Sequence, residues 1–151
     1  MNVADYLTPE RIVLLSATTK ADALGELVDR LAETSSVADC EALSQAIWRR
    51  EQLMSTGVGQ GIAVPHVRLD GILRTSMTVG VSRRGITDYE SLDGQPVHVI
   101  VLIVAVPGDH ESYIRLLAGT TSVLKHPELR DAMLEAEDPE QIFRILTKGP
   151  A

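Results

Sequence analysis

The segment from Val97 to Val106 reads VHVIVLIVAV and is nearly continuously apolar. A membrane-spanning helix needs about 20 apolar residues, so this run is much too short to be one. A short run this rich in valine and isoleucine predicts a strand that is buried on both faces, at the centre of a sheet. The elements on either side are therefore expected to pack around this strand.

Apolar residues at helical spacing predict two helices before the central strand. Thr18-Thr19 supplies the N-cap of the first, which extends to about Glu33, and Asp39 supplies the N-cap of the second, which extends to about Glu51. Ile12 to Leu15, short and β-branched, predicts a strand ahead of both helices. The early part of the chain is therefore predicted to be one strand followed by two helices.

Two more strands are predicted between these helices and the central strand. Ile62 to Val64 is a short one, and Thr75 to Ser82 is followed by a turn at Arg83-Arg84-Gly85. After the central strand the chain is helical, and Asp138-Pro139 opens its last helix. Helices before, between and after the strands predict an α/β fold: a three-layer sandwich in which a central mixed β-sheet has helices on both faces.

The composition limits the possible functions. There are 14 Lys and Arg against 21 Asp and Glu, a net charge of −7, and only 3% of the residues are aromatic. Such a surface repels nucleic-acid phosphates and offers bases little to stack on, so we expect no nucleic-acid partner. The N-terminal residues lack the basic and apolar regions of a secretory signal, so we expect a cytoplasmic protein without membrane insertion. The absence of repeats and linker-like segments predicts one domain over residues 1–151.

The stretch that carries the most chemistry runs from Arg50 to Arg68 and reads REQLMSTGVGQGIAVPHVR. Its alternating glycines exclude a helix and leave room for a tetrahedral anion. Pro65 fixes its own φ and restricts its neighbour, so the ring of His66 is presented from a defined backbone. A neutral imidazole nitrogen can attack phosphorus, and Arg50 offers a planar set of donors to phosphate oxygens. The pattern therefore fits a phosphohistidine site.

Two other interpretations fit part of this stretch. Gly57-x-Gly59-x-Gly61 resembles a dinucleotide-binding loop, but such a loop follows a strand and opens a helix, whereas this one follows a helix and opens a strand. His66 also fits a structural histidine beside a tight loop, and spacing alone does not decide between this and a functional site. The sequence has no His-x-x-x-His pair, carboxylate-rich cluster, G-x-S-x-G elbow or P-loop, so we expect neither a metal nor another cofactor.

The sequence GQGIAVPH, with STG and an arginine upstream, resembles the active-site signature of the enzyme IIA domains of the bacterial phosphotransferase system. The similarity is to the fructose, mannitol and nitrogen-regulatory type, and it covers nearly the whole chain. LTPERIVLLSATTKADALGELVDRLAE is similar to the family's first strand and helix, VHVIVLIVAVPGDH to its central strand and following loop, and LRDAMLEAEDPEQIFRIL to its closing helices.

The resemblance implies a phosphoryl carrier, a component of a relay rather than a stand-alone enzyme. It would take the group from a histidine phosphocarrier protein and pass it to a transport subunit, IIB. The alternative is a nitrogen-regulatory signalling protein whose phosphorylation state controls its binding to partner proteins. His66 matches the family's phosphoaccepting histidine, which uses its Nε2 atom. Arg50 matches the arginine that steadies the phosphoryl group, with Arg49 as the alternative, and Ser55 and Thr56 match a polar position near the site.

Many family members have a second histidine just after the central strand. This sequence has Tyr113 at that place, and His110 lies three residues earlier, one helical turn away. Either His110 reaches the same space, or Tyr113 donates a hydroxyl, or the second role is absent. The sequence leaves these three possibilities open.

Overall fold

The computed structural model describes residues 3–34, 39–72 and 74–148. The predicted limits of the domain, residues 1 and 151, lie outside these ranges. The elements follow one another in the order η1 (Val3–Asp5), η2 (Pro9–Arg11), β1 (Ile12–Leu14), α1 (Lys20–Thr34), α2 (Cys40–Leu53), β2 (Gly57–Gly59), β3 (Ile62–Ala63), β4 (His66–Arg68), β5 (Ser76–Ile86), β6 (Val97–Ala105), α3 (His110–Leu124), α4 (Pro127–Glu135) and α5 (Pro139–Lys148), where η marks a 3-10 helix.

The strands form one mixed sheet around β6. The sheet has six strands in the order β1-β5-β6-β3-β2, and β4 also pairs with β6. β6 is antiparallel to β5 and parallel to both β3 and β4, while β1 is parallel to β5. The prediction of a central strand is therefore confirmed.

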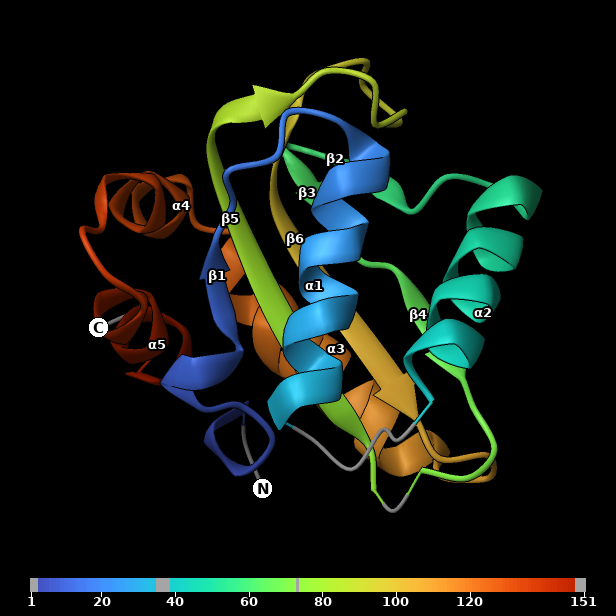
Figure 1. Cartoon of the computed structure of the whole chain (residues 1–151). Helices are drawn as coiled ribbons and strands as arrows, with labels where there is room; N and C mark the ends of the chain where they lie inside the picture. Colours follow the sequence, from blue (N-terminus) through green and yellow to red (C-terminus); the bar gives the residue numbers. More distant parts are fainter. Residues whose placement is uncertain (1–2, 35–38, 73, 149–151) are drawn as a thin grey trace.

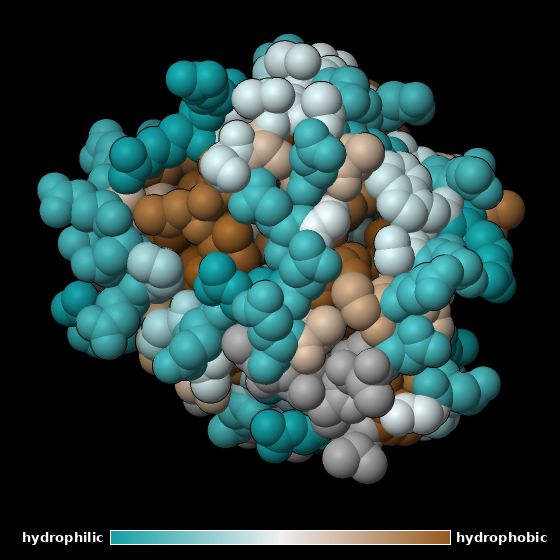
Figure 2. Space-filling model, viewed as in Figure 1, coloured by the Kyte–Doolittle hydropathy of each residue, from teal (hydrophilic) through white to brown (hydrophobic). Residues whose placement is uncertain are grey.

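Helices cover both faces of this sheet. Figure 1 shows α1 in front of the sheet and α3 behind it. Successive side chains of a strand point to opposite faces, and those of β6 divide between two apolar clusters, one with residues of α1 and α2 and one with residues of α3, α4 and α5. Figure 2 shows the face that carries α1: hydrophilic side chains cover most of it, and apolar ones are visible between them. The predicted three-layer sandwich is confirmed.

The predicted caps are present at both early helices. Oγ1 of Thr19 accepts a hydrogen bond from the N–H of Asp22 at 3.2 Å, just before α1. Oδ1 of Asp39 accepts from the N–H of Ala42 at 2.9 Å, just before α2. These bonds satisfy N–H groups that have no partner within the helix.

The turn predicted at Arg83-Arg84-Gly85 is wrong, because β5 continues to Ile86. The register with β6 shifts near this end of β5, and Gly85 has a φ of +87°. A Cβ at Gly85 would lie only 2.9 Å from the Cβ of Pro96. Glycine therefore fits both the backbone conformation and the close approach, and an irregularity in the ladder replaces the turn.

No helix among the described residues has the length and the apolar character needed to span a bilayer.

Candidate functional site

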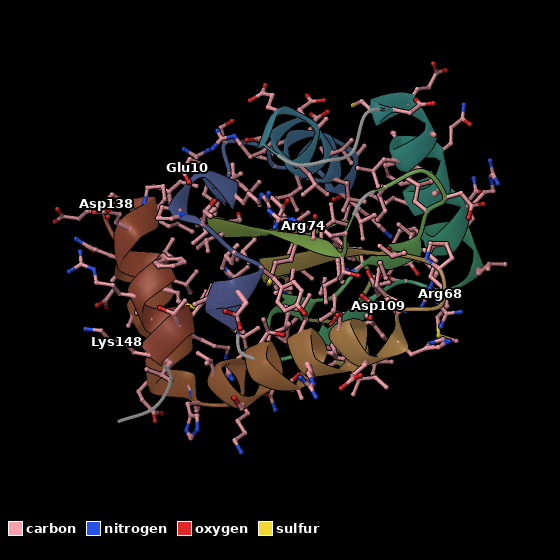
Figure 3. The ribbon with its side chains drawn as sticks, turned by 90° about the horizontal axis from the view of Figure 1, so that it is seen from below. Glu10, Arg68, Arg74, Asp109, Asp138 and Lys148 are labelled. Carbon is pink, nitrogen blue, oxygen red and sulfur yellow. The ribbon has the colours of Figure 1, made fainter. Side chains whose placement is uncertain are left out.

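β4 brings His66 to the place where α2 ends and α3 begins. Figure 3 shows Arg68, the last residue of β4, between α2 and the end of α3 that Asp109 precedes. β4 is parallel to β6, with His66 opposite Ile103. The candidate site therefore lies at the carboxyl end of the central strand, where open α/β sheets commonly bind ligands.

The ring of His66 is half-buried, and a hydrogen bond fixes it. Its Nδ1 lies 3.0 Å from the carbonyl oxygen of Val64. Because a carbonyl oxygen only accepts, Nδ1 carries the ring proton and Nε2 carries the lone pair. The backbone therefore selects the tautomer whose Nε2 can act as a nucleophile.

The backbone on both sides of Pro65 is itself fixed. The N–H of Val64 donates to the carbonyl oxygen of Thr56, and the N–H of Ile103 in β6 donates to the carbonyl oxygen of Pro65, both at 3.0 Å. Pro65 has no N–H to donate, and it separates β3 from β4. His66 therefore opens a strand of its own, and the backbone that carries its ring is held from two sides.

Arg50 lies beside His66. Its Nη1 donates to the carbonyl oxygen of Met54, just after the end of α2, at 2.8 Å. A guanidinium has five N–H donors, so this bond leaves donors for an anion. Arg49, the alternative named from the sequence, does not line the hollow at His66. That hollow has a volume of about 190 Å³ and is lined by Arg50, His66, Val67, Arg68, Ala105 and Tyr113.

Tyr113 and His110 have different surroundings. The ring centroid of Tyr113 lies 5.0 Å from that of His66, with the planes tilted by 32°. Burial raises the pKa of the Tyr113 hydroxyl, and the charges of Arg50 and Arg68 offset this only in part, so the hydroxyl stays protonated at neutral pH and can donate to an anion. His110 does not line the hollow, and its Nδ1 lies 2.8 Å from Nη2 of Arg68. The structure therefore places Tyr113, and not His110, against His66.

Sequence reasoning missed a buried carboxylate next to Arg50. Glu51 is only 7% exposed and forms an ion pair with Lys20, with 2.8 Å between Oε2 and Nζ. Its carboxylate also accepts from the hydroxyl of Tyr89 at 3.1 Å, from the N–H of Thr56 at 3.3 Å and from the Thr56 hydroxyl. Burial raises the pKa of the Tyr89 hydroxyl, which therefore stays a donor. This network holds Thr56, the residue whose carbonyl supports the backbone at His66.

A signal for Glu51 was present in the sequence. It follows Leu43 and Ile47 at the four-residue spacing of the buried face of α2, and all three side chains are buried. The two polar loop residues after α2 both anchor the loop: Thr56 bonds to Glu51, and Oγ of Ser55 donates to the carbonyl oxygen of Glu90 at 2.6 Å. Their hydroxyls are thus engaged with the protein itself.

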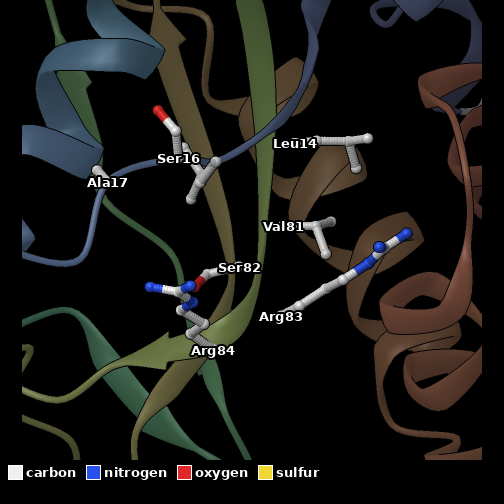
Figure 4. A pocket seen from close by; sticks show the side chains of 8 residues that line it. Leu14, Ser16, Ala17, Val81, Ser82, Arg83 and Arg84 are labelled. Carbon is white, nitrogen blue, oxygen red and sulfur yellow. The ribbon is translucent and has the colours of Figure 1, made fainter.

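Other parts of the described chain offer less chemistry. A hollow of about 420 Å³ lies at the end of β1, and its lining (Figure 4) has arginines and serines but no histidine, cysteine or carboxylate. Nδ1 of His98 lies 2.8 Å from the carbonyl oxygen of Ser82, and His126 pairs with Glu128, so both rings are engaged in structural contacts. No group of three metal-ligating side chains occurs among the residues described.

The chain is similar to known proteins over nearly its whole length. The family model described as "Phosphoenolpyruvate-dependent sugar phosphotransferase system, EIIA 2" matches residues 5–149. The chain is 34% identical to a PTS system fructose-specific EIIABC component from Bacillus subtilis over 98% of its own length, but it spans only 23% of that relative. It is 30% identical to a nitrogen regulatory protein from Bradyrhizobium diazoefficiens, over 100% of this chain and 98% of the relative.

Solved structures share the fold. The crystal structure of nitrogen regulatory protein IIA-Ntr from Neisseria meningitidis superposes with a TM-score of 0.87, at 24% identity, over 96% of this chain and 99% of that one. Enzyme IIA mannitol from Escherichia coli, solved by NMR in complex with phosphorylated IIB mannitol, gives a TM-score of 0.75 at 23% identity, over 93% and 96% of the two chains. The chain therefore belongs to the EIIA 2 family of the phosphoenolpyruvate-dependent sugar phosphotransferase system, whose domains carry phosphoryl groups.

Proposed function

We propose that this protein accepts a phosphoryl group on Nε2 of His66 from a histidine phosphocarrier protein and passes it to a transport subunit of the IIB type. One observation carries the proposal: Nδ1 of His66 donates to the carbonyl oxygen of Val64 at 3.0 Å. This bond leaves Nε2 as the nucleophile, in a hollow that it shares with the guanidinium of Arg50. Both the tautomer and the nearby positive charge suit attack on a phosphoryl group.

Transfer of the phosphoryl group to His66 changes only the bonds to phosphorus and moves no proton at the site. The lone pair of Nε2 forms an N–P bond while the N–P bond in the donor breaks, and that electron pair returns to the donor's imidazole. The proton on Nδ1 stays there, donated to Val64, and Arg50 stabilises charge on the phosphoryl oxygens. In the onward step Nε2 is the leaving atom, and a thiolate or imidazole of the acceptor forms the new bond to phosphorus.

The surface around His66 suits a protein partner. A second hollow of about 450 Å³ opens beside His66, and its lining is mostly apolar. Three large apolar side chains that line this hollow are exposed to solvent. They are Met54 (69% exposed), Val58 (51%) and Leu92 (83%). Such a patch beside a reactive atom is typical of a docking site, and the IIA mannitol structure in complex with phosphorylated IIB supports a partner of that type.

A regulatory function is the second candidate. By the sequence resemblance, Tyr113 stands where many family members have a second histidine, and the chain matches a nitrogen regulatory protein over nearly the whole length of both. A phosphoryl group adds a charge of about −2 at the edge of the apolar patch, which would change what binds there. Either function places the protein in the cytoplasm, with its phosphoryl donor.

Phosphorylation by the general phosphotransfer proteins tests the shared step. With phosphoenolpyruvate and those proteins, the wild type should gain an acid-labile phosphoryl group in its intact mass. His66→Gln should gain none, whereas His126→Gln, a matched change at the N-cap of α4, should label normally. A wild type that never labels, or a His66→Gln variant that labels equally, would overturn the proposal.

A second measurement separates the two functions. The phosphorylated protein is mixed with IIB subunits, and the label on each protein is followed with time. A relay predicts rapid loss of label to a IIB subunit. A regulator predicts that the label stays and that only one phosphorylation state captures a partner.

A further inference from the structure

Arg68 shares the hollow with His66 and Arg50. His66 and Arg68 lie two residues apart on β4, so their side chains point to the same face of the strand. Arg50 comes from α2, and Arg50 and Arg68 are both among the residues that line the hollow of about 190 Å³. The phosphoryl site therefore has a second cation, which the motif alone did not indicate.

His110 holds Arg68 in place. Nη2 of Arg68 lies 2.8 Å from Nδ1 of His110. A guanidinium only donates, so Nδ1 of His110 carries the lone pair and accepts. His110 is the first residue of α3, and that end of the helix is capped by Asp109, which accepts from the N–H of Ser112 at 3.3 Å and from the hydroxyl of Thr75 at 3.0 Å. The acceptor for Arg68 is thus carried on a fixed helix end.

The charge of this hollow is opposite to that of the whole chain. The protein has a net charge of −7, yet the residues that line the hollow include two arginines and no aspartate or glutamate. Both guanidinium groups also act on Tyr113, since their charges lower the pKa of its hydroxyl against the effect of burial. Two cations and a hydroxyl donor that face one small space suit the oxygens of a dianionic phosphoryl group.

We propose that Arg68 is a second phosphoryl-binding residue at His66 and that His110 is its positioning residue. The inference rests on the proposed function for the identity of the anion. In it, His110 contacts Arg68 and not the phosphoryl group. In this assignment Tyr113 packs against His66 directly, and His110 acts through Arg68.

The test reads the phosphoryl group directly. Phosphoramidate, a small-molecule donor, is used to phosphorylate His66 without any protein partner, and the phosphorus NMR shift is titrated with pH. A nearby cation favours the dianion, so Arg68→Gln should raise the titration midpoint by about half a unit or more, and His110→Ala should raise it by a smaller amount. Arg115→Gln removes the same charge from the exposed face of α3 and should leave the midpoint unchanged.

Each result decides a separate point. A midpoint in Arg68→Gln equal to that of the wild type would overturn the contact between Arg68 and the phosphoryl group. A shift in Arg68→Gln with none in His110→Ala would overturn the positioning role of His110. Phosphoramidate phosphorylates His66 without a protein partner, so this test does not depend on the proposed function. If the proposed function is wrong, the phosphorylated donor protein will fail to label the wild type.

Discussion

The ring of Tyr113 packs against the ring of His66, with 5.0 Å between their centroids. Burial raises the pKa of the Tyr113 hydroxyl above its ordinary value of about 10, so this hydroxyl is protonated at neutral pH. It can therefore donate to a phosphoryl oxygen, but unlike an imidazolium it brings no positive charge. Because of this contact, we expect substitutions at position 113 to change the rate of phosphoryl transfer at His66.

Removing the Tyr113 hydroxyl should slow phosphorylation moderately. We expect Tyr113→Phe to reduce the rate of transfer to His66 by about tenfold or more, the loss of one hydrogen bond to a charged group. Tyr113→His should instead speed onward transfer to a IIB subunit, because an imidazolium can stabilise the departing group. Rapid-quench measurements of label on both proteins check both changes. Tyr6→Phe, which removes a hydroxyl that donates to Ser112 of α3 at 3.0 Å, is the control and should transfer at the wild-type rate.

Replacing Glu51 should destabilise the fold. Glu51→Gln keeps the size of the side chain but leaves the ammonium group of Lys20, which is 2.8 Å away, without its counter-ion. Breaking a buried pair by removing one partner typically costs about 3 kcal/mol in the free energy of unfolding, and urea denaturation measures this. Glu135→Gln, an exposed change in α4, should cost under about 0.5 kcal/mol. Equal losses in both variants would show that the pair contributes little.

Replacing Gly57 or Gly25 by alanine should change the free energy of unfolding in opposite directions. A Cβ at Gly57 would lie 2.2 Å from the carbonyl oxygen of Glu90, whereas a Cβ at Gly25, inside α1, would meet nothing within 4 Å. Gly57→Ala should therefore lower the free energy of unfolding by about 2 kcal/mol or more through overpacking against backbone. Gly25→Ala should raise it by about 1 kcal/mol, because alanine favours the helix. Thermal unfolding of both variants checks the signs, and a stable Gly57→Ala protein would contradict the close approach.

Arg83 and Arg84 are adjacent in sequence, and we expect them to contribute differently to stability. Figure 4 shows their side chains pointing in opposite directions. Nε of Arg83 donates to the carbonyl oxygen of Leu134 at 3.0 Å, and its Nη2 donates to that of Ala136, so the guanidinium satisfies the C-terminal end of α4. Arg83→Ala should lower the free energy of unfolding by about 1.5 kcal/mol, and Arg84→Ala by under about 0.5 kcal/mol. Urea denaturation of the pair gives the comparison, and the reverse order of losses would refute it.

The local patterns predicted most of the fold. The apolar run from Val97 to Val106 predicted the central strand, and Thr19 and Asp39 cap the helices that the pattern placed after them. These signals are local: a cap acts on N–H groups two or three residues ahead, and the apolar run describes one strand. The single-domain organisation stays a prediction.

The parts that sequence reasoning missed depend on distant residues. Gly85 lies within β5 rather than in a turn, close beside Pro96, and the sequence gives no sign of that approach. The contact of Arg68 with His110 joins residues 42 positions apart, on β4 and α3. For the site, the motif indicated His66 and Arg50, but the choice between His110 and Tyr113 needed the packing of α3 against β4. The roles proposed for these residues await the measurements above.

The cap of α3 should make the stability depend on pH in acid. Hydrogen bonds from Ser112 and Thr75 hold the pKa of the Asp109 carboxyl below its usual value. A carboxyl with a lower pKa in the folded state contributes stability that is complete above its unfolded pKa of about 3.9 and is lost as pH falls through the folded value. Asp109→Ala should therefore lower the free energy of unfolding by about 1 kcal/mol at pH 7, and the difference from wild type should shrink below about pH 4. Urea denaturation at a series of pH values measures this, with Asp70→Ala, an exposed change in the turn after β4, as the control. A difference that stays constant from neutral pH into acid would show that the ionised carboxylate of Asp109 is not what holds the start of α3.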